Sequence, residues 1–157
     1  IPVKFEGETA IDRPITVGGQ EYRITCVSMG NPHGVVFCKS PDAVALEAVG
    51  PLFEHHELFP ERVNTEFIRV LDDHTLKMRV WERGSGETWA CGTGATAVCV
   101  ATIMLGHAGK KGEELTVIAK GGTLKLTHLA NNHVILRGPA VTVFEGVIDI
   151  PDEVINK

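Results

Sequence analysis

The sequence predicts an α+β domain of mostly antiparallel strands, curled into a barrel around one buried central helix. Two observations support this fold class. Many segments alternate apolar and polar residues, as half-buried strands do, and the segment from about Thr93 to Leu105 contains no charged residue. A helix that is apolar all round has no face for solvent, so it must be buried on all sides. In a chain of 157 residues, strands have to wrap around it.

The expected strands fall into two groups. The first group comprises residues 22–29, 34–38, 67–71 and 75–81, with a hairpin turn at 72–74. The second group is a meander after residue 113, in which Gly121-Gly122 and Asn131-Asn132 mark turns. Its strands are expected at 114–119, 123–129, 133–137 and 141–150.

A shorter helix is expected between the strands of the first group. Ser40 is a suitable N-cap, and Pro41 suits the first helical position because its fixed φ is helical. The helix should run to about Val49, where Gly50-Pro51 would end it.

Composition and charge exclude several classes of protein. With 43% hydrophobic and 22% charged residues, residues 1–157 are expected to form a single globular domain. The net charge of -5 is spread along the chain, so neither nucleic acid nor a membrane surface is a predicted partner. No segment approaches the roughly 20 apolar residues of a membrane-spanning helix. The four cysteines form no CxxC pair and follow no secretory signal, which predicts a cytoplasmic protein with free thiols and no metal site.

The predicted central helix begins in the sequence ACGTG, with the thiol of Cys91 at its N-terminus. The helix dipole and the unpaired N–H groups of the first turn favour a thiolate there, which should lower the pKa of Cys91. The same N–H groups bind carboxylates, and the glycines allow a substrate to approach the backbone. The arrangement suits removal of a proton from a carbon next to a carboxylate.

Each of these features also has a structural interpretation. A lone cysteine is most often a small buried apolar side chain. That interpretation applies to Cys26, Cys38 and Cys99, and it stays open for Cys91.

Other polar residues nearby have two interpretations as well. Glu82 and Arg83 end a predicted strand, where charges are usually solvated. Alternatively, the arginine could bind a carboxylate and the glutamate an ammonium group, which would together hold an amino acid. Asn31 and His33 could simply belong to a turn, and Asn64 could cap a loop.

Four motifs in one order resemble the diaminopimelate epimerase family. Residues 82–95, ERGSGETWACGTGA, resemble the family signature around its second catalytic cysteine. Upstream, SMGNPH at 28–33 and HELFPERVNTEF at 56–67 are similar to two further family segments. Downstream, GPA at 138–140 and VFEG at 143–146 resemble the closing strand of the family.

The resemblance implies a reaction and a set of roles at the reacting carbon. The family interconverts LL- and meso-diaminopimelate without pyridoxal phosphate, any other cofactor or a metal, using two cysteines on opposite faces of the α-carbon. One thiolate removes the proton while the other thiol delivers one from behind. By position, Cys91 would be one of the pair. Gly92 and Thr93 would donate backbone N–H groups to the reacting-centre carboxylate, Glu82 would bind its ammonium group, and His33 would lie near the reacting carbon.

The resemblance also implies a distal binding site and a missing half. Arg83, Asn64 and Asn31 would hold the far end of the substrate. Family members have two similar domains with the active site between them, and the other cysteine lies in a CGNG motif. No CGNG occurs in this sequence. The chain therefore corresponds to the C-terminal half, its expected partner is the N-terminal half, and it should be inactive alone; formation of a homodimer stays open.

Two competing interpretations remain. One is another isomerase of the same fold, similar to the phenazine-biosynthesis or proline-racemase enzymes, although Glu82-Arg83 beside the ACGTG sequence favours a substrate with a second carboxylate. The other is a non-catalytic amino-acid-binding module. Selective alkylation of Cys91 would separate a catalytic thiol from a structural one.

Overall fold

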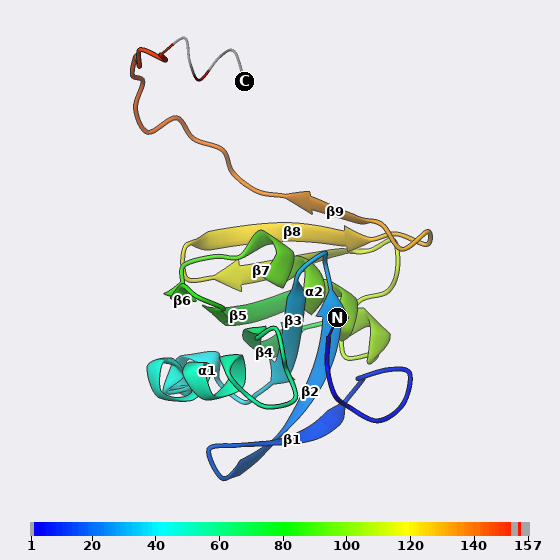
Figure 1. Ribbon diagram of the computed structural model, residues 1–157. Helices are drawn as coiled ribbons and strands as arrows, with labels where there is room; N and C mark the ends of the chain where they lie inside the picture. The colour runs from blue at the N-terminus through cyan, green and yellow to red at the C-terminus, as the bar shows by residue number, and fades with distance from the viewer. Residues whose placement is uncertain (1, 152–153, 155–157) are drawn as a thin grey trace.

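The computed structural model describes residues 2–151 and 154 and consists of one mixed sheet with two α-helices (Figure 1). The described strands follow the order β1-β2-β3-β4-β5-β7-β8-β9, and β6 pairs with β5. The helical segments are the 3-10 helix η1 (Pro41–Ala43), α1 (Leu46–Glu54) and α2 (Gly92–Met104). The strands are β1 (Arg13–Val17), β2 (Gln20–Ser28), β3 (Pro32–Phe37), β4 (Asn64–Asp72), β5 (Thr75–Glu82), β6 (Gly86–Thr88), β7 (Glu114–Ala119), β8 (Gly122–His128) and β9 (Val134–Arg137).

Most neighbouring strands are antiparallel, but β3–β4 and β5–β7 are parallel. Parallel neighbours need a long connection between them. The first connection contains η1 and α1, and the second contains β6 and α2. The two helices are therefore the crossovers of the sheet, and the α2 crossover carries the ACGTG sequence.

Two apolar clusters lie on opposite faces of the central strands. Alternate residues of a strand point to opposite faces, so Val35 and Ile68 pack on the α2 side while Val36 and Phe67 pack on the other. Eight residues of α2 are buried, and six of them belong to the apolar cluster around it. The predicted buried central helix is thus confirmed, with Cys91 as its N-cap residue.

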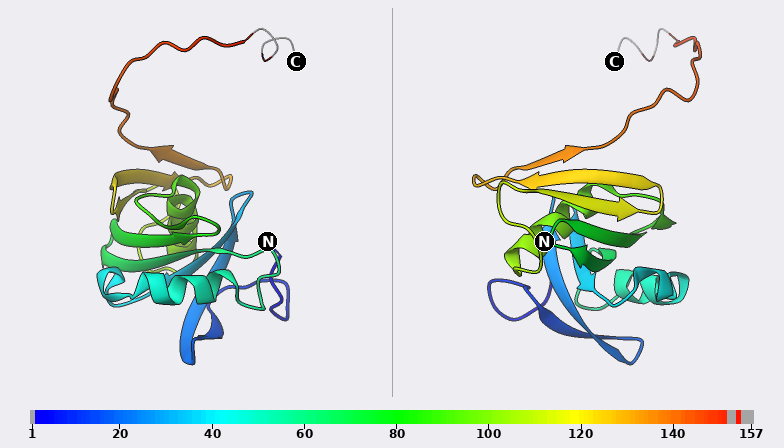
Figure 2. Two further views of the ribbon diagram at one scale, coloured as in Figure 1. Left: turned by 60° about the vertical axis from the view of Figure 1, so that its left-hand side comes forward. Right: turned by 180° about the vertical axis from the view of Figure 1, so that it is seen from behind.

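Closure into a barrel, which the sequence predicted, is not confirmed. The sheet curls about α2 but remains open, because β1 and β9 are the two ends of the strand order and no pairing between them occurs among the described residues (Figure 2). The buried residues of β1 belong to the second cluster, which packs against α1, and none of them belongs to the cluster around α2, so this edge of the sheet does not close over α2.

The predicted boundaries of the first helix were wrong. Pro41 begins only the short η1, and α1 runs through Gly50-Pro51 instead of ending before it. Proline in a helix interior costs about 3 kcal/mol. Full burial of Leu46 and Phe53 contributes about 1.5–3 kcal/mol each, which offsets that cost. Packing against the sheet therefore decides where this helix lies.

Three strand predictions also differ from the structure. Residues 141–150 contain no strand, and the segment after β9 leaves the sheet with Val143 at 86% and Val147 at 100% exposure (Figures 1 and 2). None of the described strands pairs with this apolar segment. Strands β1 and β6 were not predicted, because β1 contains Pro14 and β6 spans only three residues. No helix among the described residues is long and apolar enough to cross a membrane.

Candidate active site

Cys91 lies where β6 leads into α2, and its side chain is turned toward the helix. The Sγ atom accepts a hydrogen bond from the Gly94 N–H at 3.3 Å and lies 3.5 Å from the hydroxyl oxygen of Thr93. Cys91 is only 7% exposed, whereas Gly92 and Thr93 are exposed. The first turn of α2 therefore presents N–H groups to the surface directly beside the thiol, which is the geometry expected of a carboxylate site.

The thiol of Cys91 is not acidified in the way the sequence suggested. Burial raises the pKa of Cys91, while the hydrogen bonds from Thr93 and Gly94 lower it and the nearby carboxylates of Glu82 and Glu66 raise it further. The net direction is upward. Helix N-terminal stabilisation is present, but removal from water outweighs it, so the expected lowering of the pKa was wrong for this chain.

Asn31 and His33 join Cys91 through a chain of hydrogen bonds. The Asn31 Nδ2 group donates to the Thr93 hydroxyl oxygen at 3.3 Å, and Asn31 Oδ1 lies 3.1 Å from His33 Nε2. His33 Nδ1 lies 2.6 Å from the Glu66 carboxylate, and both of these side chains are completely buried. The structure thus brings the β2–β3 turn, β4 and the start of α2 together at one place.

Asn64 connects this cluster to Arg83. Its Nδ2 group donates to the Pro32 carbonyl at 3.0 Å, and its Oδ1 accepts from the Arg83 backbone N–H at 2.9 Å. Among the described residues, the Arg83 guanidinium forms one hydrogen bond, to the Glu61 carbonyl at 2.9 Å, and no ion pair. Its charge is therefore available to an anion.

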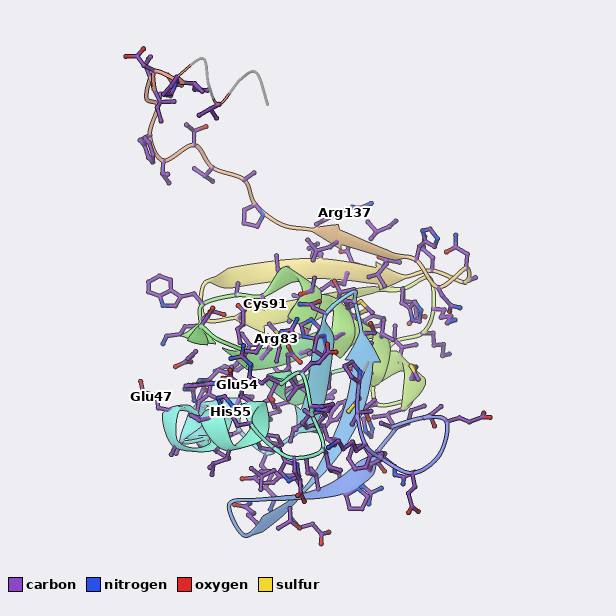
Figure 3. All side chains as sticks on the ribbon, in the orientation of Figure 1. Glu47, Glu54, His55, Arg83, Cys91 and Arg137 are labelled. Carbon is purple, nitrogen blue, oxygen red and sulfur yellow. The ribbon has the colours of Figure 1, made fainter. Side chains whose placement is uncertain are left out.

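Glu82 is half-buried on the same side of the molecule. Its carboxylate accepts a hydrogen bond from the Thr88 hydroxyl, and its charge acts on Cys91. Figure 3 shows Arg83 between α1 and Cys91. A carboxylate, a free arginine and a thiol beside helix N–H groups can together bind both ends of an amino dicarboxylic acid.

Two buried acids of this region were not predicted from the sequence. Glu66 in β4 contacts His33, and Glu54 in α1 accepts hydrogen bonds from Trp81, Gly84 and Arg62. The available signal was weak: Glu54 directly follows Leu52-Phe53 and Glu66 directly precedes Phe67-Ile68, so each acid adjoins an apolar pair, and a charge buried with such residues requires a partner. Among the described residues no group of three or more His, Cys, Asp and Glu side chains could hold a metal ion.

The sequence is similar to that of known diaminopimelate epimerases. The family model described as diaminopimelate epimerase matches residues 25–143. The diaminopimelate epimerase of Acetivibrio thermocellus is 52% identical over 151 residues, which covers 96% of this chain and 53% of that protein. That of Desulfovibrio desulfuricans is 54% identical over 137 residues, covering 87% of this chain and 47% of that protein. The chain spans about half the length of the curated relatives it matches.

Solved structures with low sequence identity share the fold. A probable proline racemase from Agrobacterium radiobacter superposes with a TM-score of 0.57 at 16% identity, over 80% of this chain and 45% of that chain. A hydroxyproline epimerase from Agrobacterium vitis gives a TM-score of 0.55 at 18% identity, over 80% and 44%. At these identities the likeness concerns the fold alone. From the family match and the identity over nearly its whole length, the chain belongs to the diaminopimelate epimerase family.

Proposed function

We propose that this chain is the C-terminal half of an enzyme that epimerises LL-diaminopimelate to meso-diaminopimelate, with Cys91 as one of its two acid–base thiols. The observation that carries the proposal is the position of Cys91 at the N-cap of α2, beside exposed N–H groups and hydrogen-bonded to Thr93. The match to diaminopimelate epimerases over 96% of the chain supports the choice of substrate.

At the reacting carbon, the carboxylate of the substrate accepts hydrogen bonds from the backbone N–H groups of Gly92 and Thr93. Glu82 binds the ammonium group. His33, which is hydrogen-bonded to Asn31, lies near the reacting carbon. Cys91 then exchanges the α-proton on one face. Holding the carboxylate at a helix N-terminus also stabilises the negative charge that develops when the α-proton leaves.

At the distal end, Arg83 binds the second carboxylate, since its guanidinium has no acidic partner among the described residues. An arginine can bind a carboxylate with two parallel hydrogen bonds. Asn64 and Asn31 complete this end of the site. Asn64 also fixes the Arg83 backbone, so it holds the arginine in place as well as lining the site.

Inversion requires a second proton-transfer group on the other face of the α-carbon. We assign that group to an N-terminal half carrying a second cysteine, and expect this chain to be inactive alone. Two observations support a partner. The chain spans about half the length of its relatives, and the segment after β9 carries three apolar side chains that are more than 80% exposed, namely Val143, Phe144 and Val147. Apolar side chains exposed in series mark a surface that another protein segment covers. All four cysteines are free thiols, which is consistent with the proposed cytoplasmic location.

The test follows the α-proton of LL-diaminopimelate in deuterated water. We expect no epimerisation by this chain alone, and epimerisation once it is combined with the N-terminal half of a family member. Cys91→Ser should abolish the restored activity, whereas Cys38→Ser, which changes a half-buried thiol outside the site, should retain it. A folded pair that leaves the α-proton in place would refute the substrate assignment, and epimerisation by the Cys91→Ser pair would refute the role of the thiol.

A further inference from the structure

The segment that leads from β6 to Cys91 is held by the turn between β7 and β8. This turn consists of Lys120 and Gly121, and Figure 1 shows it at the same end of the sheet as β6. The Gly121 N–H donates a hydrogen bond to the Trp89 carbonyl at 2.7 Å. Next to it in the turn, Lys120 Nζ lies 3.6 Å from the Glu87 carboxylate of β6. The turn therefore contacts the segment at two places, both shortly before the thiol.

Gly121 fits against the backbone of this segment with no space for a side chain. A Cβ atom placed on Gly121 would lie 3.0 Å from Trp89 Cβ, 3.1 Å from its carbonyl oxygen and 3.3 Å from its carbonyl carbon. None of these atoms is the end of a flexible side chain, so the contact can be relieved only by movement of a backbone. The φ of Gly121 is not positive, so alanine can adopt this conformation. The contact with Trp89, and not backbone strain, is what requires a glycine here.

The segment, and not the turn, is the part that gives way. The β7–β8 ladder continues up to the turn, where Ala119 pairs with Gly122. Residues 89 and 90 belong to no strand or helix and are exposed. Two groups of the candidate site are close to them in the chain, because the Thr88 hydroxyl donates to the Glu82 carboxylate and Cys91 is the N-cap residue of α2. Movement of Trp89 is therefore passed on to the thiol.

From these contacts we infer that Gly121 is a positioning residue, which sets the place of the Cys91 thiol relative to the N–H groups of Gly92 and Thr93. It acts through the backbone of Trp89 and not by contact with the reacting atoms. Helix α2 is fixed by its buried residues, so a shift of the preceding segment alters the alignment of the thiol with the first turn of the helix. The inference rests on the proposed carboxylate site at this turn.

The size of the effect follows from the contact. Carbon atoms of different residues pack at about 3.5–4.0 Å, so Gly121→Ala requires Trp89 Cβ to move by about 0.5 Å from its 3.0 Å approach. A misplacement of about 1 Å can slow a reaction about 100-fold. Half that shift corresponds to about tenfold on a logarithmic scale, and to less where the movement is partly absorbed along the chain.

The test compares two alkylating reagents of nearly the same shape. Iodoacetate carries a carboxylate on the carbon that the thiol attacks, as the proposed substrate does on its α-carbon, whereas iodoacetamide is neutral. Mass spectrometry measures both rates at Cys91 of this chain at about pH 8. The carboxylate preference is the iodoacetate rate divided by the iodoacetamide rate. In the native chain it should be higher than for Cys91 of the same chain unfolded in urea, because the N–H groups of α2 hold the reagent.

We expect Gly121→Ala to lower the carboxylate preference by about threefold to tenfold. The matched control is Gly122→Ala. A Cβ on Gly122 would meet nothing within 4 Å, and its φ of +149° is one that alanine rarely adopts. This variant therefore strains the strand next to the turn without touching Trp89, and it should keep the native preference. A merely structural loss of stability would act on both variants and on both reagents.

The other thiols report whether a variant is folded. Burial raises the pKa of Cys26 to about 12 and that of Cys99 to about 11, so both should stay unmodified while the fold is intact. Glu87→Ala serves where Gly121→Ala does not fold, because it removes the carboxylate that pairs with Lys120 and Arg79. Loss of a negative charge alone favours an anionic reagent. A lower preference in Glu87→Ala would therefore come from displacement of the segment.

Each outcome decides the inference. A native preference in folded Gly121→Ala, or in Glu87→Ala where the glycine variant does not fold, would overturn it, and so would an equal loss in Gly122→Ala. In these cases the native chain still prefers iodoacetate, and the proposed function stands. A native chain with no greater preference than the unfolded chain would instead refute the carboxylate site itself, and the inference with it.

Discussion

Glu54 offers a sharp test of how the Arg83 turn is held in place. It lies in α1 and is 4% exposed, and its carboxylate accepts hydrogen bonds from three groups. These are the Trp81 indole N–H at 2.7 Å, the Gly84 backbone N–H at 2.8 Å and the Arg62 guanidinium at 3.1 Å. Figure 3 shows Glu54 on the helix that faces Arg83. One carboxylate therefore connects α1, β5 and the turn that carries Arg83.

Replacing Glu54 by Gln keeps the shape but removes one acceptor. If the amide oxygen keeps the bonds from Gly84 and Arg62, the amide NH2 group faces the Trp81 N–H, and two donors meet. The protein then loses a bond to a charged group and leaves a buried donor unpaired. The combined loss is about 2–4 kcal/mol of unfolding free energy. For a domain of this size each kcal/mol lowers Tm by about 2–4 °C.

The matched control is Glu47→Gln in the same helix. Glu47 is exposed in the first turn of α1 and makes no hydrogen bond or ion pair with a described side chain. Its interaction with the helix dipole is lost, together with a solvent-screened attraction to the Arg79 charge, and the two together cost less than about 1 kcal/mol. Denaturant unfolding followed by tryptophan fluorescence measures both variants, because Trp81 belongs to the cluster. Equal midpoints for Glu54→Gln and Glu47→Gln would refute the argument.

Three further changes test the packing around the site. Burial alone would raise the pKa of Glu54, but hydrogen bonds from Trp81 and Gly84 lower it overall. Its contribution to stability is thus present above the unfolded pKa of about 4.3 and lost as pH falls through the folded pKa; denaturant midpoints between about pH 5 and about pH 3 should fall less steeply in Glu54→Gln than in the native chain. Gly50→Ala should lower the free energy of unfolding by about 1–3 kcal/mol, because the added Cβ would lie 2.3 Å from the Trp81 ring. A variant more stable than the native chain would show that the higher helix propensity of alanine outweighs this close contact. Gly94→Ala should alter the rate at which iodoacetamide alkylates Cys91, because its Cβ would lie 2.7 Å from Glu66 Oε1 and 3.2 Å from Cys91 Sγ and would displace these groups; an unchanged rate would contradict that placement.

The parts of the fold that local sequence patterns determine were predictable. Helix α2 was predicted because thirteen residues without a charge leave no alternative to burial. Strands β5 and β8 were predicted because apolar and polar residues alternate along them. Helix α1 was misplaced because its position depends on Leu46, Phe53 and the close approach of Gly50 to Trp81. Such contacts join residues about 30 positions apart and leave no periodic signal in the sequence.

The candidate site shows the same division. Cys91 stood out because its glycine neighbours and its place before an apolar helix are local features. Glu66 did not, because its place in the site depends on its buried contact with His33, which lies on the parallel strand β3. The strand pattern nevertheless contains a signal: Glu66 shares its face of β4 with Ile68, which lies in the α2 core. A lone acid on a core-facing position requires a buried partner.

The raised pKa of Cys91 agrees with the chemistry proposed for a pair of thiols. When one thiolate removes a proton, the other cysteine must be protonated in order to deliver one, and the roles exchange in the reverse direction. A thiol that was permanently ionised could act only as the base. Burial keeps Cys91 protonated, while the hydrogen bonds from Gly94 and Thr93 stabilise the thiolate once it forms. Cys91 can therefore deliver a proton as a thiol and, once ionised, accept one as a thiolate.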